Sequence, residues 1–79
     1  MKVRGYIKNI ILGVMDAEGS YARDLVEEVS ERVGEPFSIQ RVGSYLRVMF
    51  ASGEVRREAE IEEGCLRRYK WFRNDSGGV

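Results

Sequence analysis

Residues 38–73 read SIQRVGSYLRVMFASGEVRREAEIEEGCLRRYKWFR, and the spacing of the apolar residues changes halfway along them. Up to Ser52 they recur every three or four positions, as on one face of a helix, and Ser38 is a favourable N-cap for that helix. After Gly53 apolar and polar residues alternate, which is typical of a strand with one covered face. Gly53 stands at the change, where a left-handed residue commonly ends a helix. This pattern predicts a helix over residues 38–52, followed by a strand.

The second half of the stretch predicts a β-hairpin. Residues 55–61 form its first strand, and the face that is expected to be covered carries Val55, Arg57, Ala59 and Ile61. Glu62-Glu63-Gly64 supplies a turn, and residues 66–72 form a returning strand rich in aromatic residues. We expect these aromatic side chains to close the core rather than to stack on single-stranded bases. They are Tyr69, Trp71 and Phe72.

Two further helices are predicted ahead of residue 38. Apolar residues repeat with helical period from Ala22 to Val33, with Ser20 as the N-cap and Gly34 as the C-terminal stop. A first helix over about residues 4–16 turns one apolar side to the core, namely Val3, Ile7, Ile10, Ile11 and Val14. The sequence therefore predicts one α+β domain over residues 1–73, and the turn-prone residues 74–79 predict a flexible tail.

The helix over residues 38–52 has two distinct sides at 100° per residue. Its buried side is expected to carry Ile39, Val42, Leu46, Met49 and Phe50. The opposite side is expected to project Gln40, Arg41, Ser44, Arg47 and Val48.

Charge is balanced overall but unevenly distributed along the chain. The 79 residues hold 13 basic and 13 acidic side chains, so the net charge is zero. Residues 16–35 carry seven acids against two bases, whereas residues 38–57 carry four bases against one acid. Four glutamates follow in residues 58–63, and four bases in residues 64–73. This segregation predicts a domain with one basic face and an acidic back.

The composition excludes several classes of site. With no histidine and only Cys65, the chain cannot assemble a zinc site from nitrogen and sulfur ligands or a histidine-based nucleophile. A solvated helix face explains the carboxylates of residues 24–31, and no glycine-rich phosphate loop is present. We therefore expect no enzyme, no cofactor, no metal and no small-molecule substrate. The longest apolar run, residues 10–15, is too short to cross a membrane, and we expect a cytoplasmic protein without a membrane partner.

The order of these elements resembles the winged helix-turn-helix superfamily over about residues 4–73. Residues 45–58 look like the end of that family's recognition helix running into its wing, and residues 67–73 look like its basic, aromatic last strand. The pattern is most similar to small prokaryotic regulators of the MarR and PadR kind. The chain departs from it at Glu54, where many members have leucine, and in the acidic residues of the wing. The resemblance implies three helices followed by a β-hairpin wing, and binding to double-stranded DNA.

Within that resemblance, the helix over residues 38–52 becomes the recognition helix. Its Gln40, Arg41, Ser44 and Arg47 suit base edges, while Ser38 at the helix start suits a phosphate. Further phosphate contacts are expected from Arg56, Arg57, Arg67, Arg68 and Lys70. The competing interpretations are a solvated helix face, a plain N-cap at Ser38, and cross-strand pairing of the hairpin bases with Glu58, Glu60 and Glu62.

Three functions follow as hypotheses. The first is a sequence-specific DNA-binding protein, a small transcriptional regulator that forms a homodimer through the N-terminal helix by way of an exposed Leu12 or Met15. The alternative is a winged-helix protein-interaction module that binds no nucleic acid. A third option is association with RNA or ribosomes through the basic strand. The alternative gains if Arg41 and Arg47 are neutralised by Glu54 and the hairpin glutamates.

Overall fold

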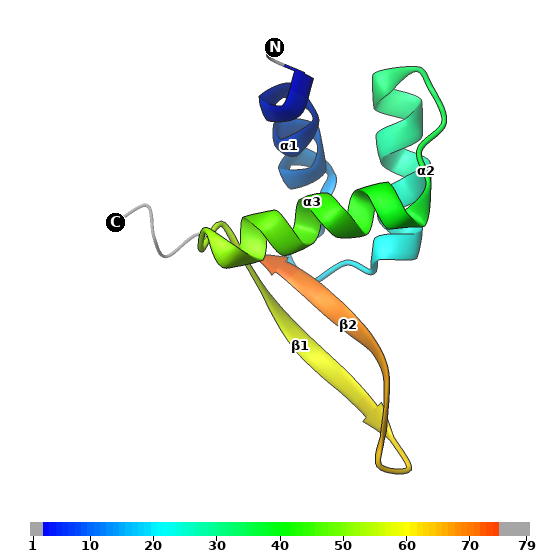
Figure 1. Ribbon diagram of the computed structural model, residues 1–79, viewed down its shortest axis with the longest axis vertical. Coiled ribbons are helices and arrows are strands. Elements are labelled where there is room, and N and C mark those ends of the chain that lie inside the picture. The colour runs from blue at the N-terminus through cyan, green and yellow to red at the C-terminus, as the bar shows by residue number, and fades with distance from the viewer. Residues whose placement is uncertain (1–2, 75–79) are drawn as a thin grey trace.

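The protein is α+β, with three helices followed by a two-stranded antiparallel hairpin, in the order that the sequence predicts. The computed structural model describes residues 3–74, with side chains from residue 6 onward. Its helices are α1 (Val3–Val14), α2 (Ala22–Val33) and α3 (Ile39–Ala51), and its strands are β1 (Val55–Glu62) and β2 (Cys65–Arg73). α1 and α2 stand on the same side of α3, and the hairpin projects away from all three (Figure 1).

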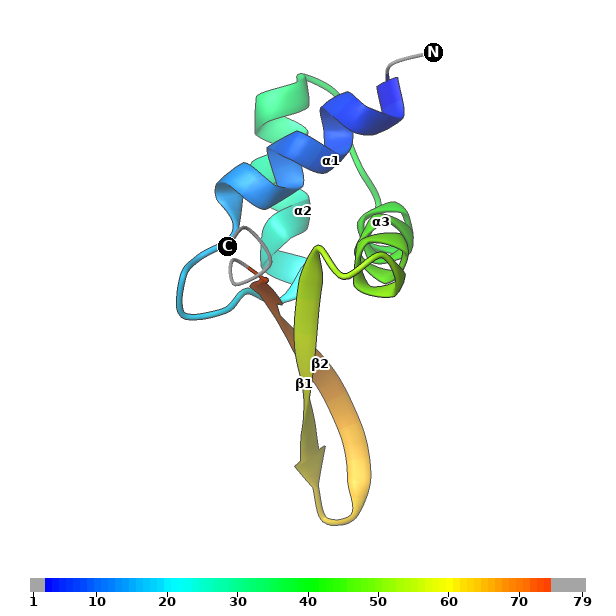
Figure 2. The ribbon, with the colours of Figure 1, turned by 90° about the vertical axis from the view of Figure 1, so that its left-hand side faces the viewer.

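One core joins the three helices to the base of the hairpin. α1 contributes Ile7 and Ile11, and α2 contributes Leu25 and Val29. α3 and the hairpin complete this core with Val42, Leu46, Met49, Val55 and Trp71. From the side, only the base of the hairpin lies beside the helices (Figure 2). The predicted covered face of β1 is therefore correct for Val55 and wrong for Ala59 and Ile61, which lie beyond the helices and are exposed.

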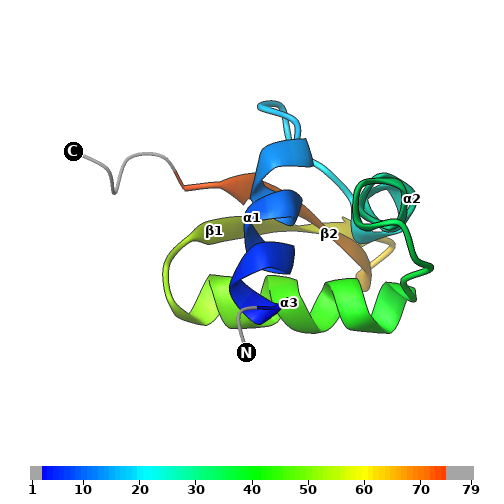
Figure 3. The same ribbon diagram turned by 90° about the horizontal axis from the view of Figure 1, so that it is seen from above.

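The ends of α2 and α3 follow local chemistry. Ser38 caps α3, because its Oγ accepts a hydrogen bond from the backbone N–H of Arg41 at 3.1 Å. Gly34 and Gly53 follow α2 and α3 with φ of 87° and 85°, the left-handed region that favours glycine. Seen from above, α2 lies end-on beside the first turn of α3 (Figure 3). Only residues 34–38 connect the two helices.

Ser20 has a different role from the predicted one. The N-cap of α2 is Tyr21, without a side-chain cap. Ser20 is buried and exchanges two backbone hydrogen bonds of 2.8 Å with Trp71, as a one-residue bridge to β2. Its Oγ accepts a hydrogen bond from the backbone N–H of Asp16. Pairing with a distant strand therefore replaces capping, a contact that local sequence does not encode.

Three predictions about the burial of apolar side chains are wrong. Ile39 is 51% exposed and Phe50 is 40% exposed, because both lie on the flank of α3 toward the projecting hairpin. Phe50 contacts Trp71 edge to face, with 6.4 Å between ring centroids. Met15 was expected to be exposed but is only 4% exposed, since α1 ends at Val14 and the chain then turns Met15 into the core.

The hairpin has a two-residue turn. Glu63 and Gly64 both have positive φ, 53° and 78°, as hairpin turns of this length favour. The register pairs Glu60 with Arg68, and a bulge follows between Glu60 and Ile61. Trp71 enters the core as predicted, and Tyr69 packs against it half-buried, whereas Phe72 is half-buried outside that cluster. Asn74, expected in the tail, donates hydrogen bonds to the carbonyls of Glu54 and Gly53. The rest of the predicted tail lies outside the described residues.

Candidate nucleic-acid interface

The outer side of α3 carries the polar residues that the sequence places there. Gln40, Arg41, Ser44 and Arg47 are all exposed. Arg47 donates a hydrogen bond from Nη2 to the Oγ of Ser44 at 3.2 Å, and the guanidinium of Arg41 lies 4.1 Å from the centroid of the Phe37 ring. α3 contains no aspartate or glutamate. The side therefore combines arginine, amide and hydroxyl donors without a carboxylate.

The positive charges on α3 are not neutralised within the described part of the chain. Neither Arg41 nor Arg47 forms an ion pair there. Glu54, the acid nearest to Arg47 in sequence, instead accepts hydrogen bonds from Ser52 Oγ at 2.7 Å and Lys8 Nζ at 3.0 Å. The pKa of Glu54 is lowered by these bonds, first by that of Ser52 and then by that of Lys8. Lys8 thus holds Glu54 away from the basic side of α3.

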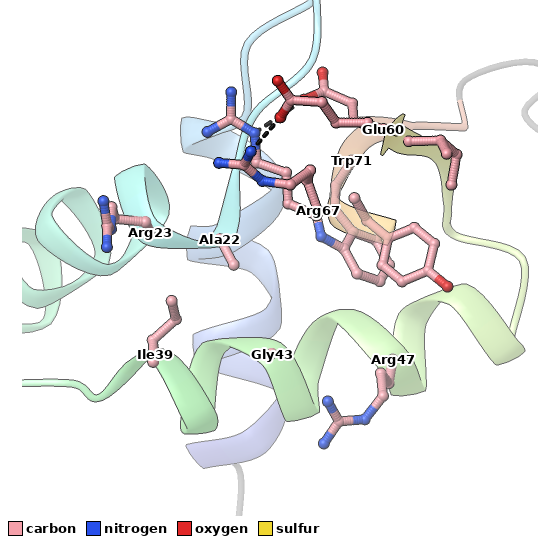
Figure 4. A pocket seen from close by; sticks show the side chains of 12 residues that line it. Ala22, Arg23, Ile39, Gly43, Arg47, Glu60, Arg67 and Trp71 are labelled. Carbon is pink, nitrogen blue, oxygen red and sulfur yellow. Dashed lines mark hydrogen bonds and ion pairs between the residues drawn. The ribbon is translucent and has the colours of Figure 1, made fainter. Parts of the chain in front are cut away.

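A groove of about 920 Å³ separates α3 from the hairpin. Four arginines from three elements line it, Arg23 of α2, Arg47 of α3, and Arg67 and Arg68 of β2. Two glutamates, Glu60 and Glu62, offset part of their charge. Figure 4 shows the arrangement, with Ile39 and Gly43 along α3. A Cβ added at Gly43 would meet only Arg47 Nη1 within 4 Å, so this part of α3 is open.

The hairpin bases engage in two kinds of contact. Three of the bases form ion pairs with glutamates. Arg68 pairs with Glu60 at 2.9 Å, Arg67 with Glu62, and Arg56 with Glu58 at 3.4 Å. Arg57 pairs with an aromatic cluster instead, and its guanidinium lies 4.2 Å from the centroids of both Phe50 and Tyr69. The cross-strand pairing considered from the sequence is therefore present for Arg67 and Arg68, whereas Arg56 pairs with Glu58 of its own strand.

The structure brings some of the predicted site residues together and separates others. Arg47 of α3 and Arg67 and Arg68 of β2 all line the groove. Arg56 and Lys70 do not line it, and their side chains lie near the rings of Phe72 and Tyr21. Ser38 lies at the exposed start of α3, outside the groove, where it caps the helix.

Sequence reasoning missed a cluster formed by Tyr21, Glu60 and Arg68. The Tyr21 hydroxyl donates to Glu60 Oε2 at 2.6 Å, and Arg68 Nε donates to Glu60 Oε1 at 2.9 Å. These bonds lower the pKa of Glu60, first through Tyr21 and then through Arg68, and the same contacts raise the pKa values of Tyr21 and Arg68. Strand alternation could have suggested the facing pair, but nothing local connects Tyr21 to a residue 39 positions away.

Within residues 3–74, no three side chains of the histidine, cysteine or acidic types gather as they would around a metal ion. None of the helices in that range is both long and apolar enough to span a bilayer. In comparisons with known proteins, no family model, curated protein or solved structure matches the chain.

Proposed function

We propose that this chain is a winged helix-turn-helix domain that binds double-stranded DNA in a sequence-specific manner, as a small transcriptional regulator. α3 is its recognition helix and the hairpin its wing. The observation that carries the proposal is the exposed, acid-free side of α3, on which Arg41 and Arg47 have no carboxylate partner among the described residues. A face of this kind is complementary to the polyanionic surface of a duplex.

The dimensions and chemistry of α3 suit the major groove. A helix of 13 residues is about 20 Å long, and the major groove of about 12 Å width admits one helix. Arg41 and Arg47 have the fork geometry that reads guanine, and Gln40 has the amide that reads adenine. Ser44, between the two arginines in sequence, offers a hydroxyl to either base. We assign sequence readout to these four side chains.

The groove between α3 and the wing suits a phosphodiester strand. Its four arginines outnumber its two glutamates, which favours an anion in the groove. Arg67 and Arg68 approach from the wing and Arg23 from the start of α2. We assign supporting phosphate contacts outside the groove to Ser38, Arg56, Arg57 and Lys70.

A homodimer remains part of the proposal, because one domain of this size offers a small interface for tight, specific binding. With Met15 buried, α1 offers Leu12, which is half-buried, and Tyr6, which is exposed. We expect Tyr6→Asp to lower the mass in solution if α1 forms the dimer surface. An unchanged mass at concentrations where the unaltered protein is dimeric would contradict that surface.

The direct test of DNA binding is a fluorescence-anisotropy titration of the full chain with mixed-sequence duplex DNA at two salt concentrations. The proposal predicts binding that weakens with salt, at a slope implying about 3–6 neutralised phosphates. A selection from random duplexes then tests sequence specificity. Absence of binding at low salt contradicts the proposal.

One observation favours a second candidate, a winged-helix module that binds a protein. Ile39 and Ile61 are more than half exposed and both line the groove, while three wing arginines already have glutamate partners. A partner with acidic and apolar side chains would suit such a groove. Arg41 on the outer side of α3 and Arg47, which also lines the groove, have no carboxylate partner among the described residues and favour DNA. A chain that binds no duplex at low salt would favour this second candidate.

A further inference from the structure

Arg68 is held by an ion pair and an aromatic ring, and the two residues that hold it are hydrogen-bonded to each other. Its Nε donates to Glu60 Oε1 at 2.9 Å, and its guanidinium lies 3.8 Å from the centroid of the Tyr21 ring. The Tyr21 hydroxyl closes the cluster by donating to Glu60 Oε2 at 2.6 Å. Tyr21 comes from the start of α2, so the cluster also ties the wing to the helices.

Arg67, the neighbouring arginine, provides the contrast. It pairs only with Glu62 among the described residues, and both side chains are more than 60% exposed. Arg68 lies over the Tyr21 ring, whereas no aromatic ring lies under the Arg67 guanidinium in the described part of the chain. Glu60 is also more enclosed than Glu62, since its side chain is 38% exposed. The two Arg–Glu pairs lie at the same groove but differ in how firmly the arginine is fixed.

We propose that Tyr21 and Glu60 are positioning residues that hold Arg68 ready to bind a phosphate of DNA; this inference rests on the proposed function. Glu60 engages the Nε–H of Arg68, which leaves the two Nη groups for a bidentate contact with phosphate oxygens. Binding by a fixed arginine avoids most of the entropy lost when a free side chain is immobilised. Arg68 therefore acts as a preformed phosphate contact.

The proposal makes the two glutamates act in opposite directions. Each carries a negative charge at the groove proposed to hold the phosphodiester strand, so electrostatic repulsion alone predicts tighter DNA binding when either is neutralised. Both oxygens of Glu60, however, are used in holding Arg68 and Tyr21. Loss of Glu60 should therefore weaken binding, while loss of Glu62 releases Arg67 and should strengthen it.

The test compares Glu60→Gln with the matched control Glu62→Gln, by duplex titration at several salt concentrations. Freeing Arg68 should weaken binding by about two- to tenfold in Glu60→Gln, the usual effect of one unfixed long side chain. The slope of log K against log salt should change by less than about 0.9, the value for one lost phosphate contact, because the freed Arg68 keeps its charge and still reaches the phosphate in the complex. Glu62→Gln should bind the same duplex more tightly than the unaltered protein. Circular dichroism melting confirms that each variant is folded.

Two further variants separate positioning from a general structural effect. Adding Glu60→Gln to Arg68→Ala should cause no further loss of DNA affinity, because the residue that Glu60 positions is gone. Tyr21→Phe removes only the hydroxyl and should weaken binding in the same direction as Glu60→Gln. Tighter binding by Glu60→Gln, further loss in the double variant, or unchanged binding by Tyr21→Phe overturns the inference. If the unaltered protein binds no duplex, the proposed function itself fails, and the inference with it.

Discussion

α2 and α3 contribute to one core, yet their outer surfaces are opposite in charge. α2 carries four acids against two arginines, giving −2, whereas α3 carries two arginines and no acid, giving +2. The helices are 12 and 13 residues long and bury Leu25 and Leu46, respectively. A chain with zero net charge can therefore present a basic helix, because its charges are separated between neighbouring helices. The surface, rather than the total charge, is the relevant guide to partners.

The two helices also begin differently. α3 starts with the side-chain cap of Ser38, while α2 starts without one, directly after the backbone bridge between Ser20 and Trp71. The start of α3 is therefore stabilised by an adjacent side chain, whereas the start of α2 is positioned by backbone pairing with β2.

The largest effects should come from the shared core. Leu25→Ala and Leu46→Ala should each lower the free energy of unfolding by about 2–5 kcal/mol, because both side chains are fully buried. Urea denaturation followed by circular dichroism measures both. A cost below about 1 kcal/mol for either variant would contradict an equal role of the two helices in the core.

The outer surfaces should respond unequally to the same change of charge. Arg47→Glu on α3 should weaken duplex binding by about 30- to 100-fold, through loss of one bidentate contact and added repulsion. Arg32→Glu is the matched control in the last turn of α2 and should change affinity by less than about threefold. Anisotropy titrations at one salt concentration provide both values. Similar losses in the two variants would show that α3 has no special role.

The unequal starts predict a smaller effect on stability. Ser38→Ala removes the acceptor of the Arg41 N–H and should lower the free energy of unfolding by about 1 kcal/mol. Ser44→Ala, exposed within the same helix, is the control and should change it by less than about 0.5 kcal/mol. Thermal melts distinguish the two. Equal effects would argue against capping by Ser38.

The smallest effect should be a pH dependence at the junction of α3 and β1. Because folding lowers the pKa of Glu54, its stabilising effect is complete above the ordinary value of 4.5 and is lost as the pH falls through the lower, folded value. The contribution should be below about 1 kcal/mol, since Glu54 and Lys8 are each about one-third exposed. Glu54→Gln should flatten the dependence of stability on pH below 4.5. An unchanged pH profile would contradict this assignment.

Local patterns predicted most of this fold. Helical period, Ser38, Gly34 and Gly53 placed α2 and α3 to within about two residues, and strand alternation placed the hairpin. The exposed side of α3 was also predictable, because a helix fixes which residues share a side. The bridge of Ser20, the exposure of Ile39 and Phe50, and the burial of Met15 depend on where the hairpin and the chain after α1 lie, which periodicity does not specify.

The candidate site was predictable only in part. The side of α3 with Arg41 and Arg47 was identified from sequence, as was the facing of hairpin acids and bases. Arg23 of the groove and Tyr21 of the cluster were missed, since both belong to the mainly acidic residues 16–35 and reach the site only through tertiary packing.

The most direct test of the account is amide chemical-shift mapping by NMR, with isotope-labelled protein titrated with duplex DNA at low salt. The account predicts that the largest changes occur at Gln40, Arg41, Ser44 and Arg47 on α3, with small changes along Asp24, Glu27, Glu28 and Glu31 on α2. Changes centred on the outer side of α2, or no changes at all, would contradict the assignment of α3 as the DNA-binding helix.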